Sequence, residues 1–194
     1  GNATAITMDI RNNIISNTTA ASTGSIGFAV CVFATSNANL GRIAKTSDNN
    51  LYYFGTPAAT RGVSNDAATT TTTLGAYQNA LRSVGLGGPR ELRSAVEMPP
   101  FVSATDLHLT ASASTYAEGS GQVIATVTTD YDGNTRSNSN PDVGADEFTG
   151  VFVDNQAPAI LFGSLGNIGT VTNRQVTVTV DDRSGLATSS DKPR

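Results

Sequence analysis

The chain has 194 residues and a formal net charge of −4 at pH 7, and charged residues make up only 14% of it. With 38% hydrophobic residues it can form a core, so the composition excludes an intrinsically disordered chain. The acidic pI of about 4.8 and the lack of any lysine and arginine cluster argue against nucleic-acid binding. No apolar run approaches the roughly 20 residues that cross a bilayer, so we expect no membrane span.

Cys31 is the only cysteine, so no disulfide can form within the chain. It lies in the apolar run SIGFAVCVFAT, which predicts a buried strand and a structural thiol. A secreted protein with a single cysteine is more typical of bacteria than of animals. The abundance of Thr, Ser, Asn and Gly is typical of β-rich extracellular proteins, so we expect a bacterial protein that is secreted or displayed on the cell surface. Residues 1–10 do not read as a signal peptide, so a secreted form would be cut from a longer chain.

The N-terminal part predicts short strands in residues 4–19, 25–37 and 47–57, separated by corners rich in asparagine. This order of strand and corner, repeated at intervals of about twenty-odd residues, is typical of stacked-coil architectures. Residues 64–73 (SNDAATTTTT) predict a polar loop.

A short helix is predicted in residues 73–85, because Leu74, Tyr77, Leu81 and Val84 recur at helical spacing. The strand pattern returns in residues 101–114 and 121–130.

The composition changes after Phe148, where a proline-containing stretch predicts a linker over residues 149–158. Val176, Val178 and Val180 then alternate with threonines, as in a half-buried antiparallel strand. We expect residues 159–194 to begin an immunoglobulin-like β-sandwich. Such a sandwich needs about a hundred residues, so the chain is expected to stop inside this domain, as a fragment.

The stretch DYDGNTRSNSNPDVGADEF, residues 130–148, holds five of the sixteen acidic residues, and we call it the acidic segment. In a first interpretation, Asp130, Asp132 and Asn134 are calcium ligands, because they place oxygen atoms at alternate positions. The usual calcium loop also needs a glutamate at a fixed later position, and this sequence has none there. In a second interpretation the carboxylates are catalytic, as in a glycoside-cleaving pair.

The third interpretation, which we favour, is structural. Gly133 forms a turn with the preceding aspartate, Arg136 pairs with nearby carboxylates, and Asp142 and Glu147 bind open backbone groups. The acidic segment would then close the end of a stack of strands.

Two further features bear on binding. His108 is the only histidine, so a histidine zinc site or a Ser-His-Asp triad would have to include it. In DLHL it alternates with leucines, which places it on the opposite face of a predicted strand, and we expect it to face solvent or pack at a corner and not to be catalytic. Tyr52 and Tyr53 could form an aromatic platform on which a sugar ring stacks.

The stretches SDNNLYY, PPFVSATDLHLTASASTYAEGSG, VTTDYDGNTR and PDVGADEF resemble, in this order, the C-terminal end of secreted right-handed parallel β-helix proteins. These belong to the pectate-lyase-like class and are abundant in Bacteroidota. The resemblance implies that residues 1–148 form the last coils and the cap of a parallel β-helix. The cap residues would be Asp132, Gly133, Arg136, Asp142 and Glu147. The match is looser at residues 112–119, where the family often has Ser-Pro-x-x-x-x-Gly. The tail is similar to the β-sandwich repeats that follow in such proteins.

From these features we expect an all-β, non-catalytic segment of a large surface protein, adhesin-like or structural. The alternative is the C-terminal part of a β-helix polysaccharide lyase or glycoside hydrolase with its active site upstream. The expected partners are a polysaccharide or surface glycan, and neighbouring domains or copies of the chain in self-assembly. The only cofactor considered is Ca²⁺.

Overall fold

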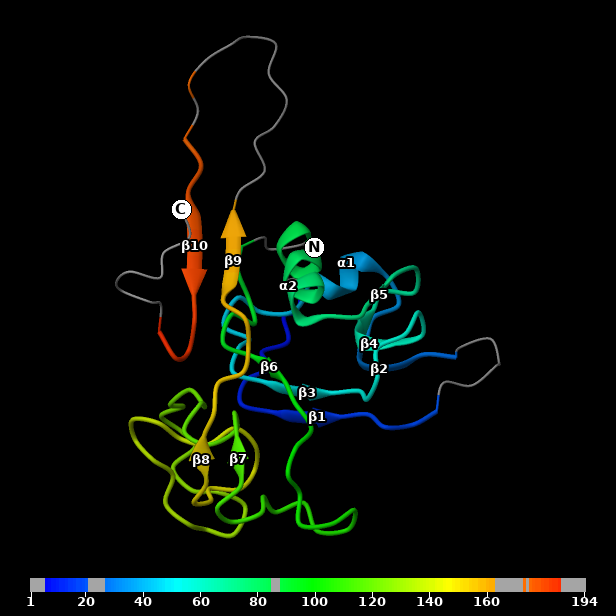
Figure 1. Ribbon diagram of the computed structural model, residues 1–194. Helices are drawn as coiled ribbons and strands as arrows, with labels where there is room; N and C mark the ends of the chain where they lie inside the picture. Colours follow the sequence, from blue (N-terminus) through cyan, green and yellow to red (C-terminus); the bar gives the residue numbers. More distant parts are fainter. Residues whose placement is uncertain (1–5, 21–26, 85–87, 163–172, 174, 186–194) are drawn as a thin grey trace.

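The computed structural model describes residues 6–20, 27–84, 88–162, 173 and 175–185 (Figure 1). The elements in these residues are short, and only α2 exceeds five residues. They are β1 (Ile14–Ser16), β2 (Ala29–Phe33), α1 (Asn37–Leu40), β3 (Leu51–Tyr53), β4 (Arg61–Asn65), β5 (Thr70–Thr71), α2 (Leu74–Ser83), β6 (Ala95–Val96), β7 (Ser114–Thr115), β8 (Val151–Phe152), β9 (Ala159–Phe162) and β10 (Val178–Asp181).

The centre of the molecule is a three-stranded parallel sheet in the order β1-β3-β6, seen at the middle of Figure 1. Ile14 pairs with Leu51, and Leu51 pairs with Ala95, so one side chain from each strand lies in the same row. Parallel pairing requires a long connection between consecutive strands. Here those connections contain the two helices and a second sheet.

The second sheet has the order β2-β4-β5. Strands β2 and β4 are parallel, whereas β4 and β5 form an antiparallel hairpin in which Ser64 pairs with Thr71. Residues 64–73 were predicted to be a polar loop, which is correct for residues 66–69 and wrong for residues 64–65 and 70–71, which are paired strands. Ser64 and Asn65 are buried because their side chains bond the hydroxyls of Thr71 and Thr70, which lets polar residues occupy a covered hairpin.

The predicted parallel β-helix is wrong. The described strands form separate sheets of two or three strands, and these sheets do not close into a solenoid. Parallel pairing exists, but each strand has only two to five residues and β4–β5 runs antiparallel. Of residues 99–148, only the two-residue β7 is a strand, and it pairs with β8. The central sheet therefore has no fourth strand.

Two hydrophobic clusters support the sheets. The first lies between the two larger sheets and the helices, and comprises Leu40, Ile43, Tyr52, Phe54, Val63, Tyr77 and Leu81. The second lies between the central sheet and residues 101–148, and comprises Leu51, Ala95, Leu109, Tyr116, Ala117 and Val143. Because Leu51 and Tyr52 are neighbours in β3 and point to opposite faces, this one strand separates the two clusters.

The predicted helix is confirmed as α2. Tyr77 and Leu81 are fully buried, and the Thr73 hydroxyl accepts a hydrogen bond from the N–H of Ala76 at 3.2 Å, which caps the helix start. Among the described residues, neither helix combines the length and the apolar character that crossing a bilayer demands.

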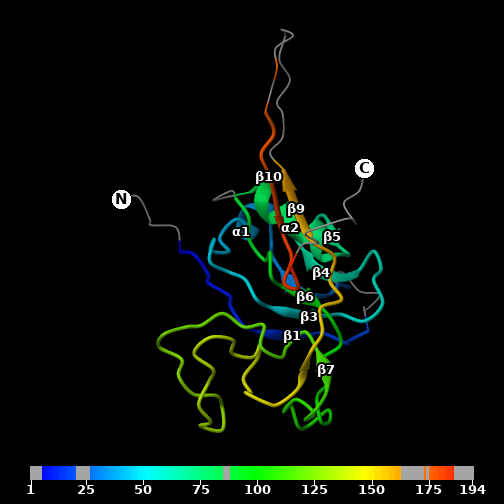
Figure 2. The same cartoon turned by 60° about the vertical axis from the view of Figure 1, so that its left-hand side comes forward.

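The C-terminal part forms two small sheets. Strand β8 lies inside the predicted linker and pairs in parallel with β7, and β9 pairs antiparallel with β10. In Figure 2 the β9–β10 hairpin projects away from the central sheet. Arg93 binds Asp181 of β10 at 3.0 Å and ties the hairpin base to the sheet. The boundaries at residues 148, 158 and 159 and the sandwich expected after them stay predictions.

Candidate functional site

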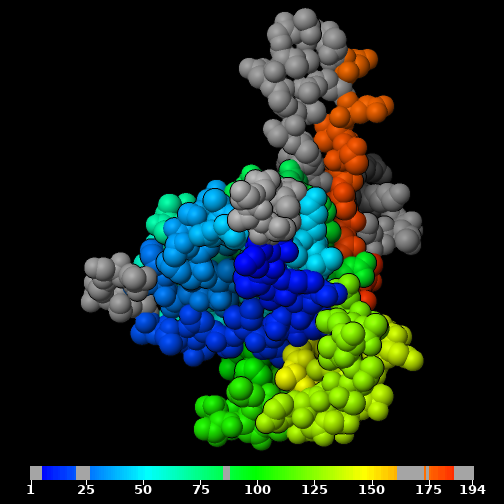
Figure 3. All heavy atoms as spheres, turned by 180° about the vertical axis from the view of Figure 1, so that it is seen from behind, coloured from blue at the N-terminus to red at the C-terminus, as the bar shows by residue number. Residues whose placement is uncertain are grey.

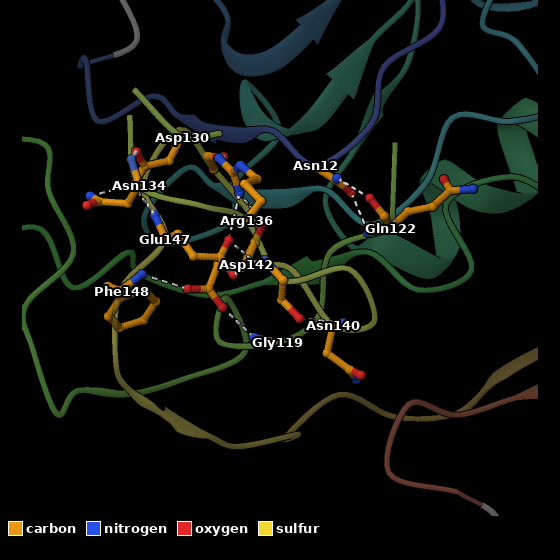
Figure 4. A network of polar contacts seen from close by, with 12 residues as sticks. Asn12, Gly119, Gln122, Asp130, Asn134, Arg136, Asn140, Asp142, Glu147 and Phe148 are labelled. Atoms are coloured by element: carbon orange, nitrogen blue, oxygen red, sulfur yellow. Dashed lines mark hydrogen bonds and ion pairs between the residues drawn. The ribbon is translucent and has the colours of Figure 1, made fainter. Parts of the chain in front are cut away.

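The acidic segment begins in a turn organised by Asp130 (Figure 4). Its Oδ1 accepts hydrogen bonds from the N–H groups of Asp132 and Asn134, at 2.9 and 2.8 Å. Its Oδ2 accepts from the Asn134 side-chain amide and from the N–H of Glu147, both at 3.1 Å. Burial raises the pKa of Asp130, but these hydrogen bonds outweigh burial and hold the pKa below its usual value.

Asp142 fastens the end of the segment to a loop that precedes it in sequence. One of its oxygens accepts from the N–H of Gly119 at 2.6 Å and the other from the N–H of Phe148 at 2.8 Å. The side chain is buried, and burial raises the pKa of Asp142 to about 6 despite these two bonds.

Arg136 joins the two halves of the segment. Its guanidinium donates to the carbonyl oxygens of Asp142 at 3.0 Å and Gly144 at 2.6 Å, and it pairs with Glu147 at 3.2 Å. Glu147 also accepts from the N–H groups of Ser137 and Asp142. Arg136 therefore acts as a cross-link between loops that lack secondary structure.

The closed segment packs against the N-terminal strand region. The N–H of Gly144 donates to Asn12 and that of Val143 donates to Ala117, both at 2.9 Å. The Asn12 side chain exchanges two hydrogen bonds with the backbone of Gln122. Seen from behind, the blue N-terminal residues rest on this green to yellow part (Figure 3). The acidic segment was predicted to cap a β-helix. Because the structure has no β-helix, the segment does not cover a terminal coil, and it packs on these loops instead.

The calcium interpretation can be tested against the hydrogen bonds. Asp130, Asp132 and Asp146 each bring one oxygen within 4.8 Å of the others. However, Asp130 already accepts four N–H donors, which occupy all the lone pairs of a carboxylate. The Asn134 amide nitrogen faces Asp130, so the side chain acts as a donor there. Asp132 and Asp146 would then supply only part of the roughly six to eight oxygens that calcium takes, so backbone carbonyls and water would have to supply the rest. These hydrogen bonds therefore favour the structural interpretation over the calcium loop, and calcium binding stays a prediction.

His108 lies beside this turn, and not on a strand. Its Nδ1 is 2.5 Å from Asp106 Oδ1, and its Nε2 is 2.8 Å from Asp132 Oδ2. The hydrogen bonds to Asp106 and then to Asp132 raise the pKa of His108 to about 9, so the ring is a cation at neutral pH. The sequence pattern missed this contact because it assumed that residues 101–114 form a strand.

Tyr52 and Tyr53 differ in their surroundings. Tyr52 is fully buried, and its ring packs edge-on against Tyr77 with the centroids 5.9 Å apart. It has no open face on which a sugar could stack, and Tyr53 is half-buried. Cys31 is half-buried too, and burial raises the pKa of its thiol to about 11.

Sequence reasoning missed the buried charged residues Arg90 and Glu91. The Arg90 guanidinium donates to the carbonyl oxygens of Ile43 and Leu81, at 2.9 and 2.7 Å. It therefore satisfies the open end of α2 and the loop behind it. Arg90 and Glu91 are adjacent in an irregular segment, so they are part of no helical or strand periodicity that would predict their burial.

The Glu91 carboxylate accepts hydrogen bonds from Asn50 at 3.0 Å and from the Ser94 hydroxyl at 2.5 Å. Burial raises the pKa of Glu91 to about 7, although these two hydrogen bonds lower it. The carboxylate is fully buried, and it ties the loop of residues 91–94 to Asn50.

No protein-family model, no curated protein and no solved structure matches the chain.

Proposed function

We propose that the chain belongs to a secreted or cell-surface bacterial protein, in which it serves a non-catalytic, adhesin-like or structural role with binding to glycans. The location is supported by the composition, with its few charged residues, single cysteine and abundant threonine, serine and asparagine. The resemblance of the acidic motifs to those of secreted Bacteroidota proteins points the same way and rests on those motifs alone.

One observation carries the non-catalytic role. Asp130, Asp142 and Glu147 direct their carboxylates at backbone N–H groups of their own and neighbouring loops. A catalytic carboxylate must present its lone pairs or its proton to a substrate in a cleft. These three side chains instead replace the backbone ladder that the acidic segment lacks, which is a structural role.

The experiment is incubation of the chain with a panel of neutral and acidic polysaccharides. Reducing ends report hydrolysis, and absorbance of unsaturated sugars reports elimination. We expect neither product from any polymer. Product that forms with the wild-type chain and disappears in an Asp142→Asn variant would overturn the proposal, because it would make the acidic segment a catalytic site.

A further inference from the structure

Tyr131 is an exposed aromatic residue on a fixed turn. Its side chain is 84% exposed, although the residues on both sides take part in the hydrogen bonds of the acidic segment. Its own N–H donates to the carbonyl of Ala145 at 2.8 Å. A ring presented on such an ordered turn loses little further backbone freedom when a ligand binds.

The ring borders a hollow of about 340 Å³, whose lining also includes Leu107, Asp106, His108 and Asp146. The volume lies in the range of small-ligand pockets, about 300–1,000 Å³. Leu107 is 64% exposed, so Leu107 and Tyr131 both present apolar surface to solvent beside the polar side chains of the lining. An apolar surface rimmed by hydrogen-bonding groups suits a sugar ring, which has an apolar face and hydroxyls at its edge.

The polar groups of the hollow are held in place by contacts within the protein. His108 bridges Asp106 and Asp132, and Asp146 accepts the N–H of Leu109 at 3.0 Å. Each carboxylate has four lone-pair positions, so those facing the hollow can accept hydrogen bonds from hydroxyl groups. The lining holds two carboxylates, Asp106 and Asp146, beside the His108 ring, and a third carboxylate, Asp132, binds that ring from outside the hollow. The surroundings of the hollow are therefore negative on balance, which repels a uronate.

We propose that this hollow binds an uncharged pyranose ring of a neutral polysaccharide, stacked on Tyr131 with its hydroxyls on the Asp106 and Asp146 carboxylates. This inference rests on the glycan-binding role proposed above and adds the place of the site and the class of sugar. It also accounts for an exposed tyrosine in a turn whose other side chains serve to close the fold.

The test is affinity electrophoresis in native gels that contain galactomannan, a mixed-linkage β-glucan or xyloglucan, with polygalacturonate as the charged comparison. The wild-type chain, Tyr131→Ala and Tyr131→Phe are run side by side. We expect one of the neutral polymers to retard the wild type and Tyr131→Phe equally, because the phenylalanine ring still stacks. Tyr131→Ala is expected to bind about tenfold more weakly. Because this side chain is exposed, both variants are expected to unfold at the wild-type temperature.

Equal retardation of Tyr131→Ala and the wild type would overturn the site. Stronger retardation in polygalacturonate than in every neutral polymer would overturn the sugar class. Free migration in all the neutral gels would overturn the binding inference as a whole. None of these results changes the non-catalytic role, which is decided by product formation.

Discussion

Arg136 and Glu147 form an ion pair at 3.2 Å with side chains that are only 9% and 16% exposed. The same guanidinium donates to two carbonyl oxygens, and the same carboxylate accepts two backbone N–H groups. A partly buried pair with so many backbone partners differs from a surface ion pair, because removing one charge leaves the other buried and several backbone groups without partners.

Replacing Arg136 with alanine should therefore destabilise the chain strongly. We expect a loss of about 3 kcal/mol, or roughly 6–12 °C in Tm, measured by thermal unfolding. Arg93→Ala is the matched control, because Arg93 forms an exposed ion pair with Asp181 and should cost less than about 1 kcal/mol. Retardation by neutral polysaccharides should persist in Arg136→Ala at a temperature where it is folded. Loss of binding with unchanged Tm would contradict the structural role.

Two glycines test how tightly the acidic segment packs. A Cβ at Gly121 would lie 2.7 Å from the carbonyl oxygens of Pro141 and Asp142, and backbone atoms cannot move aside cheaply. Gly121→Ala should cost about 3 kcal/mol. Gly133 has φ +87°, and a Cβ added there would meet no atom within 4 Å. Gly133→Ala should therefore cost only about 1 kcal/mol, from backbone strain. Urea unfolding of both variants decides this, and equal midpoints would argue against the close approach.

The helix α2 could be predicted because its signal is local. Leu74, Tyr77, Leu81 and Val84 recur at helical spacing, and the first three of them lie within the helix. The alternation around Val178 likewise predicted the antiparallel strand that forms β10. Its expected half-buried face is wrong, because Val176, Val178 and Val180 are 38–49% exposed. The solenoid could not be judged in the same way, because short strands with polar corners suit many arrangements. Which strands pair, and whether β4 turns back on β5, depends on contacts between distant residues.

The candidate site was predictable only in part. A run with an arginine and five carboxylates points to internal pairing, and Arg136 does contact Glu147. The hollow beside Tyr131 forms because residues 105–108 lie against the turn at residues 131–132, where His108 contacts Asp132. This contact joins residues far apart in the sequence, so no local spacing predicts it. The prediction of DLHL as a strand also failed. Ser103 accepts hydrogen bonds from the backbone of the residues that follow it and starts a turn there.

Removal of calcium should have no effect on stability. Because the Asp130 carboxylate already accepts four N–H donors, we expect a chelator to shift Tm by less than about 1 °C and added calcium to do the same. Differential scanning calorimetry with calcium and with chelator measures this. A calcium-dependent rise of several degrees that is lost in Asp132→Asn would contradict the prediction and would identify the metal site.

The buried Glu91 carboxylate should make the chain more stable in mild acid than at neutral pH. Its pKa rises from 4.5 to about 7 on folding, because burial disfavours the charge. The unfolded chain therefore releases this proton at lower pH than the folded chain. The stabilisation is complete below about pH 4.5 and is lost as the pH rises through 7, by an amount on the order of 3 kcal/mol. Asp142, whose pKa rises to about 6 for the same reason, adds a change of the same sign.

Glu91→Gln separates the two contributions, because the amide fills the same space and carries no charge at any pH. Urea unfolding between pH 4.5 and 7.5 should show a clearly flatter pH dependence in this variant than in the wild type. The slope that remains should fall further in the double variant with Asp142→Asn, since both carboxylates act in one direction. If the single variant kept the full wild-type slope, the pH dependence would have to arise from groups other than Glu91.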